Sequence, residues 1–151
     1  MHIKIRRNEI KLIIKKMKTI NRNILLITLI FLATSCVTTI KFPISTVEPA
    51  AEITAKITKD NQSNYVIQLT ANFLASVERL TPPKSTYVVW IVTKENGIKN
   101  IGLLNSENAK KINFKTLSAF EPYEIFITAE DDGTVSAPSG IEISRVVLKS
   151  Y

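Results

Sequence analysis

The stretch TYVVWIVTK, residues 86–94, decides the fold class. Successive side chains of an extended chain point to opposite faces, so apolar residues would lie on both faces of this segment. One face would carry Tyr87, Val89 and Ile91, and the other Val88, Trp90 and Val92. A strand that is apolar on both faces is typical of the centre of a sheet. We therefore expect a central strand at residues 86–94, with Trp90 as the anchor of the core.

Short runs on either side of this stretch have the same strand character. AEITAKITKD (51–60) and YVIQLTANF (65–73) enclose the turn-forming residues DNQSN, which predicts a hairpin over residues 51–73. Asn96-Gly97 predicts a tight turn after the central strand. Further strands are expected in NIGLLN (100–105), KINFKTL (111–117), YEIFITAE (123–130) and GIEISRVVLK (140–149). Seven to eight short strands predict an all-β fold, namely an immunoglobulin-like antiparallel β-sandwich.

The first 35 residues have the composition of a secretory signal. They contain eight basic residues and one acid, whereas the rest of the chain has 12 of each sign. Lys18 and Arg22 precede the apolar run 24–33, and the apolar part of a signal is typically about 7–15 residues long. Residues 17–36 alone would make a complete signal, so Met17 is an alternative start. The other interpretation of residues 3–18 is a basic amphipathic helix that lengthens the basic region.

The only cysteine of the chain ends this leader. Leu32 to Cys36, LATSC, resembles the lipobox of bacterial lipoproteins, in which a cysteine is acylated, for example with palmitate, and becomes the mature N-terminus. The resemblance implies removal of residues 1–35 and a lipid anchor on Cys36. The alternative is an uncleaved membrane helix over Ile24–Ile40, which its five Ser and Thr residues disfavour. Either anchor places the domain outside the cytoplasmic membrane, on its periplasmic face or on the outer membrane.

The organisation that follows is a leader (1–35), a tether (36–49) and a β-sandwich domain (50–151). The tether would reach up to ~40 Å from the bilayer at roughly 3.3 Å per residue. The alternative for Lys41–Val47 is a first strand. The balanced charge after residue 35 argues against a nucleic-acid partner. His2 is the only histidine and lies in the leader, which excludes Cys/His zinc sites and histidine-dependent triads from the mature part.

Three groups of residues are weighed as sites. EDDG (130–133) offers three carboxylates for a hard cation such as Ca²⁺, but adjacent side chains alternate in direction, so we expect a solvated turn. Carboxylates that a glycosidase would need are expected to be surface charges, and the tyrosines are too few for a sugar platform. These residues are Asp60, Glu121, Glu124 and Glu142, and Tyr65, Tyr87, Tyr123 and Tyr151. We expect no catalytic, cofactor-binding or metal-binding residue, and no enzyme activity.

An ordered set of residues between Ser85 and Ile141 resembles the extracytoplasmic C-terminal domain of anti-sigma-K factors. The set consists of Tyr87, Trp90, Gly97, Gly102, Phe126, Thr128, Glu130, Gly133, Pro138 and Gly140. Asp131 and Asp132 depart from the family's pattern, which usually has Pro and often Gly there. The resemblance implies an outer, sensor-like module with no catalytic residues, and residues 1–35 are too short for a sigma-binding domain.

The expected function is therefore a lipid-anchored, non-catalytic binding or sensor module that contacts another envelope protein through a sheet edge or the loops at one end. A structural cell-envelope lipoprotein is the alternative. A carbohydrate- or ion-binding module is the weakest of the three hypotheses.

Overall fold

The structure is a computed structural model that describes residues 15–16, 39–105 and 110–148. The chain divides into two compact units, residues 1–36 and 37–151. In the first unit, Lys15 and Lys16 are helical and exposed. The second unit holds every strand described below.

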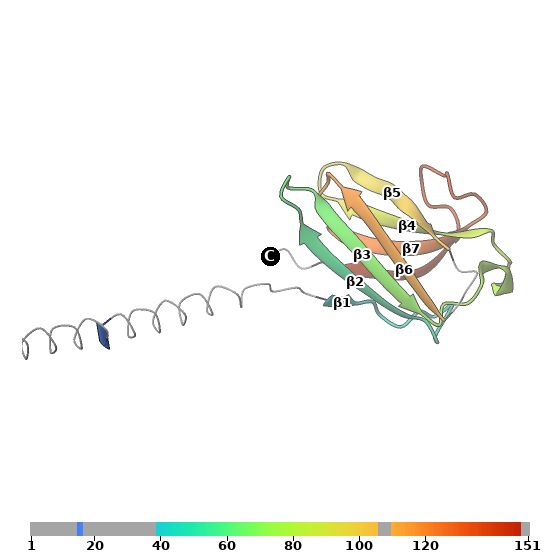
Figure 1. The fold of residues 1–151 in the computed structure, drawn as a ribbon. Coiled ribbons are helices and arrows are strands. Elements are labelled where there is room, and N and C mark those ends of the chain that lie inside the picture. Colours follow the sequence, from blue (N-terminus) through green and yellow to red (C-terminus); the bar gives the residue numbers. More distant parts are fainter. Residues whose placement is uncertain (1–14, 17–38, 106–109, 149–151) are drawn as a thin grey trace, which may run out of the picture. The chain divides into compact units, whose positions relative to one another are not determined.

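Two four-stranded antiparallel sheets form this domain (Figure 1). One sheet has the order β1-β2-β3-β6 and the other the order β5-β4-β7-β8. The strands are β1 (Thr39–Lys41), β2 (Glu52–Lys59), β3 (Tyr65–Asn72), β4 (Thr86–Thr93), β5 (Gly97–Leu104), β6 (Lys111–Ser118), β7 (Glu124–Glu130) and β8 (Ile141–Val147), with a short 3-10 helix η1 (Val77–Arg79). The predicted all-β sandwich is confirmed. Its immunoglobulin-like character stays a prediction.

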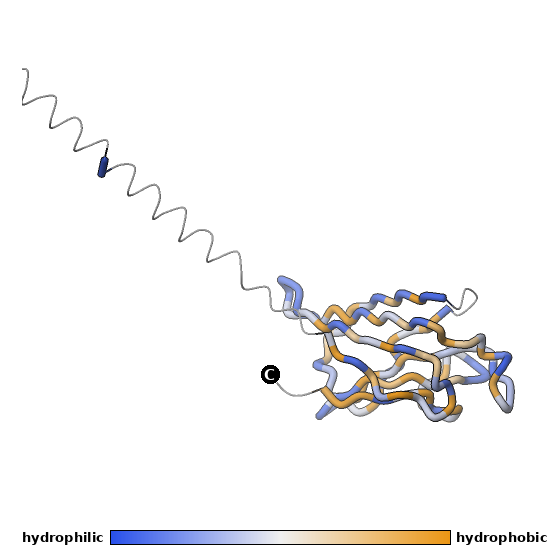
Figure 2. Tube along the Cα trace, turned by 90° about the horizontal axis from the view of Figure 1, so that it is seen from below, coloured by the Kyte–Doolittle hydropathy of each residue, from blue (hydrophilic) through white to orange (hydrophobic). Residues whose placement is uncertain are grey.

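The hairpins predicted from turn residues form as expected. β2 and β3 pair without a break from Glu52–Asn72 to Lys59–Tyr65. The carboxylate of Asp60 closes their turn, since it accepts the backbone N–H groups of Gln62 and Asn64 at 2.8 Å each. Gly97, with φ +68°, ends the β4–β5 turn in a conformation that glycine adopts without strain. Hydrophobic and hydrophilic residues alternate along most strands (Figure 2), as strands with one buried face should.

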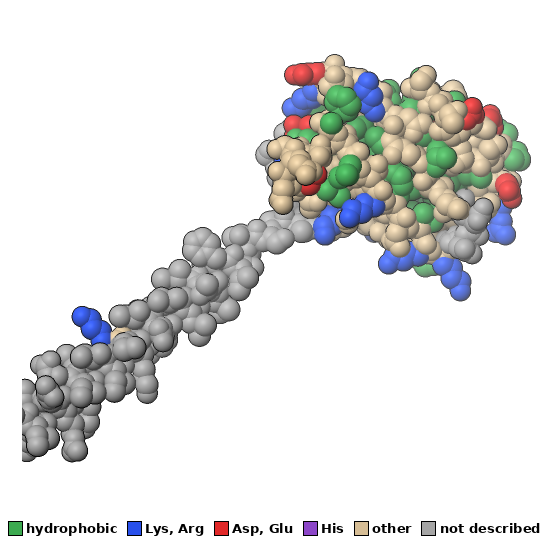
Figure 3. Space-filling view, turned by 45° about the horizontal axis from the view of Figure 1, so that its top comes forward, with side chains coloured by type: hydrophobic (Ala, Val, Ile, Leu, Met, Phe, Trp, Pro, Cys, Tyr) green, Lys and Arg blue, Asp and Glu red, His purple; other side chains and the backbone are tan. Residues whose placement is uncertain are grey.

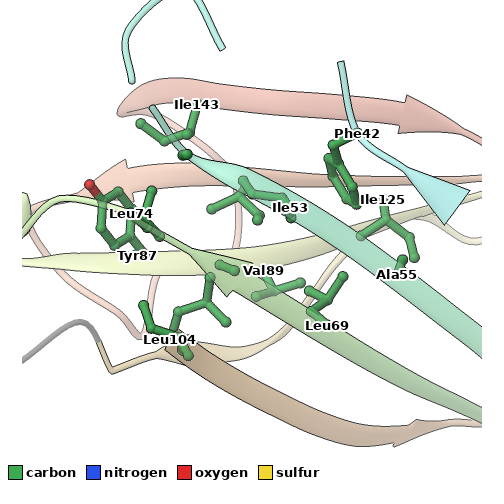
Figure 4. Close-up of a cluster of buried hydrophobic side chains, with 14 of the residues drawn as sticks. Phe42, Ile53, Ala55, Leu69, Leu74, Tyr87, Val89, Leu104, Ile125 and Ile143 are labelled. Carbon is green, nitrogen blue, oxygen red and sulfur yellow. The ribbon is translucent and has the colours of Figure 1, made fainter. Parts of the chain in front are cut away.

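The space between the sheets is filled by inward-facing apolar side chains (Figure 4). On β4, Tyr87, Val89 and Ile91 are fully buried there. They meet Ile53 of β2 and Leu69 of β3 across the interface. The hydroxyl of Tyr87 donates to the carbonyl of Ala75 at 3.1 Å, which satisfies its polar atom.

β4 is the central strand that the sequence predicts, because it lies between β5 and β7 and its residues 87–91 are buried on both faces. The expected position of Trp90 needs a correction. It is fully buried, but with Val88 and Phe126 it forms a second cluster, separate from the one between the sheets. Since side chains alternate along β4, this cluster lies on the outer face of the sheet.

The segment before β2 belongs to the sandwich from Thr39 onward. β1 pairs with β2, Phe42 is only 4% exposed, and the N–H of Phe42 donates to Ile53 O at 2.9 Å. The hydroxyl of Ser144 in β8 donates to Pro43 O at 2.9 Å. Of the two interpretations of this segment, the strand therefore holds, at residues 39–41 instead of 41–47. The part of the tether at 36–38 lies outside the described residues.

Antiparallel pairing gives the sandwich two distinct ends. The turn end contains the 60–64, 94–96 and 119–123 turns, together with the start of β1 and the end of β8. The loop end contains the 42–51, 73–85 and 131–140 connections. The turn end lies on the left of Figure 1 and the loop end on the right.

Candidate functional site

The outer face of the β5-β4-β7-β8 sheet carries a row of four side chains in register: Asn100, Trp90, Phe126 and Arg145. The rings of Trp90 and Phe126 are stacked, with centroids 6.0 Å apart and planes at 12°. The guanidinium carbon of Arg145 lies 3.9 Å from the centroid of Phe126, a cation–π contact. Trp90 and Phe126 are the aromatic members of the second cluster, and Asn100 and Arg145 flank them in the row.

The β7–β8 connection, residues 131–140, covers this row. Asn100 fixes it, because its amide donates to the carbonyls of Gly133 at 3.0 Å and Val135 at 3.1 Å. The side chain of Val135 packs against the cluster of Val88, Trp90 and Phe126. The connection therefore acts as a lid that completes a small core.

A chain of polar contacts ties the indole to this lid. The Trp90 N–H donates to the hydroxyl of Thr128 at 2.8 Å, and that hydroxyl donates to Glu130 Oε1 at 2.6 Å. Glu130 is 1% exposed. It also accepts the backbone N–H of Ser139 on Oε1 at 3.1 Å and the Ser139 hydroxyl on Oε2 at 3.0 Å.

The hydrogen bonds set the charge state of Glu130. Burial raises the pKa of the Glu130 carboxyl group. Hydrogen bonds from Thr128, the backbone of Gly140 and Ser139 lower this pKa by more than burial raises it, so it lies below the ordinary value. The carboxylate is therefore ionised and works as a hydrogen-bond acceptor that fixes the end of β7 to the start of β8.

Two glycines allow the close contacts of the lid, and a third allows a close contact between the sheets. A Cβ at Gly140 would overlap the carbonyl oxygen of Ala129. A Cβ at Gly133 would lie 2.7 Å from Leu103, and one at Gly102, where φ is +138°, would lie 2.8 Å from Phe114. Trp90, Phe126, Thr128 and Glu130 join these glycines, so most residues that carry the anti-sigma-K resemblance have packing or hydrogen-bonding roles here.

The three carboxylates of EDDG point to three different partners. Glu130 is buried, Asp131 pairs with Lys84 Nζ at 2.8 Å, and Asp132 accepts the N–H and hydroxyl of Thr134 at 2.8 Å each. The expectation of a solvated turn fits Asp131 and Asp132, which are exposed, but not Glu130. In the described part of the chain, no group of three or more His, Cys, Asp or Glu side chains could hold a metal ion.

The remaining candidates do not form a common site. Glu124 and Glu142 both bind Arg145, each at 2.6 Å, so the two carboxylates share one guanidinium. Asp60 closes its own turn and Glu121 is exposed in the 119–123 loop. Of the tyrosines, Tyr87 is buried, Tyr65 is half-buried and Tyr123 is exposed. Cys36 and Tyr151 lie outside the described residues.

The fold and this network define an all-β protein of two antiparallel sheets, one of which has an aromatic cluster on its outer face that a lid covers. The chain matches no protein-family model, no curated protein and no solved structure. Among the residues that the structure describes, no helix is long and apolar enough to cross a membrane.

Sequence reasoning missed the buried role of Glu130. The signal was present in the alternation Phe126–Thr128–Glu130, which places the carboxylate on the same face of β7 as the aromatic ring. Glu130 lies four residues beyond Phe126 on the same face, so the connection that covers the ring can also cover the carboxylate.

Proposed function

We propose that this chain is a lipid-anchored, extracytoplasmic, non-catalytic binding or sensor module that contacts another envelope protein. The anchor rests on the basic and apolar leader that ends at Cys36. The sensor role rests on the resemblance to the outer domain of anti-sigma-K factors. The proposal includes no sigma-binding domain.

The loop end supports contact with a partner. The start of β1 and the end of β8 lie at the opposite end, so an anchor at Cys36 leaves the loop end accessible. Phe73, at the start of the β3–β4 connection, is 60% exposed, and Ile44 in the β1–β2 connection is 78% exposed. Exposed apolar side chains at this end are available as anchors for a partner.

The main observation in favour of a partner contact at the loop end is the backbone conformation of Phe73. Its φ is +55°, a left-handed conformation that is uncommon for a bulky residue and costs of order 1 kcal/mol or more. Folding therefore holds an aromatic ring in water at the expense of local strain. Such an arrangement is expected where the ring contacts a partner.

Photo-crosslinking tests the partner. A photoreactive amino acid replaces Phe73 in the full-length chain, and the matched control replaces Asn96, an exposed residue of the turn end. A binding or sensor module should give one protein adduct of defined mass from position 73 and none from position 96. Adducts with many abundant neighbours or with peptidoglycan, equal at both positions, would favour the structural lipoprotein.

The anchor is tested by Cys36→Ser. Cells fed a clickable palmitate analogue should label the wild-type chain and leave the variant unlabelled, and only the wild type should fractionate wholly with membranes. A variant that is unlabelled and still fractionates wholly with membranes would favour the alternative, an uncleaved membrane helix.

A further inference from the structure

The two outer faces of the sandwich differ in what covers them. The lid formed by residues 131–140 covers the aromatic cluster on one sheet. The outer face of the β1-β2-β3-β6 sheet has polar and charged side chains along its strands, and alternate residues there are half-buried or exposed. We call it the basic face, because its charged residues are Lys41, Lys56, Lys111 and Lys115 with the single acid Glu52.

Strand register distributes these lysines over three rows of the face. Lys56 and Lys115 lie in one row, on either side of Gln68. Lys41 stands opposite Thr54 in the next row, and Lys111 is in the row after that. The charge therefore extends over three successive rows of the sheet and is not confined to one corner.

Charge in the described domain is segregated. Four lysines and one glutamate give the basic face a formal charge of +3. The other charged side chains between residues 39 and 148 that the structure describes are seven basic and ten acidic, which gives −3. Figure 3 shows several basic side chains along the lower edge of the domain. A formally neutral domain thus has one face that attracts a negatively charged surface.

The short connection to Cys36 brings this face close to the membrane. β1, which belongs to the basic sheet, begins at Thr39, three residues after Cys36. Three extended residues reach about 11 Å at most. A lipid on Cys36 would therefore hold the start of β1 against the headgroups, in place of the ~40 Å of freedom that a 13-residue tether would give.

The row of the basic face nearest the turn end holds two apolar side chains beside Thr58. Leu117 is 62% exposed and stands opposite Val66. Surfaces that lie on a bilayer combine exposed apolar side chains with lysines. The apolar side chain enters the headgroup layer, and the lysines contact anionic lipids.

From these observations we infer that the basic face docks on the anionic headgroups of the same bilayer that holds the lipid of Cys36. This inference rests on the proposed lipid anchor. The lipid supplies attachment, and the lysines supply orientation, which keeps the loop end beside the membrane and the lid turned away from it.

The experiment uses the mature protein purified from membranes, with the lipid that Cys36 is proposed to carry, reconstituted into vesicles. An environment-sensitive fluorophore is attached to Asn113→Cys, in the middle of the basic face, or to Ser136→Cys, an exposed lid residue. Cys36 is blocked by its own lipid. One set of vesicles contains 30% phosphatidylglycerol in phosphatidylcholine, the other phosphatidylcholine alone, and both carry a trace of headgroup-quencher lipid.

With phosphatidylglycerol, the label at 113 should be blue-shifted and at least twofold more quenched than the label at 136. Quenching at 113 should fall to the level at 136 in phosphatidylcholine alone, in about 0.5 M salt, and in the double variant Lys56→Glu/Lys115→Glu. The matched double variant Arg79→Glu/Lys94→Glu changes the net charge equally at exposed residues off this face and should keep the quenching.

Flotation separates the two hypotheses. If the wild type does not float with vesicles, the anchor itself fails and the docking inference fails with it. If the protein floats but the label at 113 behaves like the label at 136, the anchor stands and docking is overturned. Equal quenching at 113 in both lipid mixtures would also overturn it, because the lysines would then have no role.

Discussion

The indole N–H of Trp90 donates to the hydroxyl of Thr128 on the neighbouring strand at 2.8 Å. The same hydroxyl donates to the buried carboxylate of Glu130, which in turn accepts two hydrogen bonds from Ser139. A continuous polar chain thus links the central strand β4 to the far end of the lid. Because each buried polar atom has a partner, the lid is held by specific geometry as well as by the apolar contact of Val135.

Replacement of Glu130 by Gln tests how much these linked hydrogen bonds stabilise the fold. The amide keeps the shape of the side chain but removes the charge and presents N–H groups where Ser139 and Gly140 donate. We expect the free energy of unfolding to fall by about 1–3 kcal/mol, measured by urea denaturation. Asp131→Asn is the matched control, because its partner Lys84 is bound at an exposed carboxylate, and such pairs contribute about 0.2–1 kcal/mol. An equal loss in both variants would contradict the assigned role of Glu130.

The same pair of proteins yields a pH prediction. The pKa of Glu130 is lower in the folded state than in the unfolded state, where it is about 4.3. A lowered pKa stabilises the fold above the unfolded value and loses this effect as the pH falls through the folded value. The stability difference between wild type and Glu130→Gln should therefore be constant near pH 6–7 and shrink as the pH falls below about 4.

Other carboxylates do not obscure this measurement. Hydrogen bonds from the side chain of Asn64 lower the pKa of Asp60, and those from the backbone of Thr134 lower the pKa of Asp132. Both groups are present in the two proteins, so their acid destabilisation cancels in the difference. A difference that stays constant down to pH 3 would show that the charge of Glu130 does not stabilise the fold.

Local sequence patterns were sufficient for the strands from β2 onward and for their turns, although β5 begins at Gly97, three residues before the predicted segment. Period-two alternation located β2 and β3, and apolar residues on both faces located β4 at the centre of its sheet. Asn96-Gly97 located the β4–β5 turn. These features depend on neighbours in sequence, which is why a pattern can reveal them.

The features that sequence reasoning missed depend on contacts between distant segments. Trp90 was expected in the main core, because Val135, which helps to cover it, lies in a connection 45 residues away. Phe42 was assigned to the tether, because its burial depends on the pairing of β1 with β2 and on the core between the sheets. The basic face could not be predicted from the net charge of the domain, which is zero, because strand register decides which lysines share a surface.

Gly140→Ala should open the lid without unfolding the sandwich. The added Cβ would overlap the carbonyl oxygen of Ala129, so the start of β8 and the partners of Glu130 must shift. Trp90 is the only tryptophan of the chain and is fully buried, so its fluorescence should shift to longer wavelength and become more accessible to acrylamide.

The control for this experiment is Gly97→Ala. Its φ of +68° makes alanine unfavourable by roughly 1–2 kcal/mol, but no atom lies within 4 Å of the added Cβ. Its Trp90 emission in the folded state should equal that of the wild type. If both variants shift the emission alike, Trp90 reports general loosening, and the lid is not what shields it.

Phe42 and Phe73 offer a matched pair for the boundary of the domain. Phe42 is 4% exposed between the sheets, whereas Phe73 is 60% exposed at the loop end. Phe42→Ala should therefore lower the free energy of unfolding by about 3–5 kcal/mol, the usual range for a large aromatic side chain removed from a core. Phe73→Ala should change it by about 0.5 kcal/mol or less. Urea denaturation of both variants tests this contrast. Comparable small losses would mean that residues 39–45 behave as a tether after all, and the short distance from Cys36 to the sandwich would no longer hold.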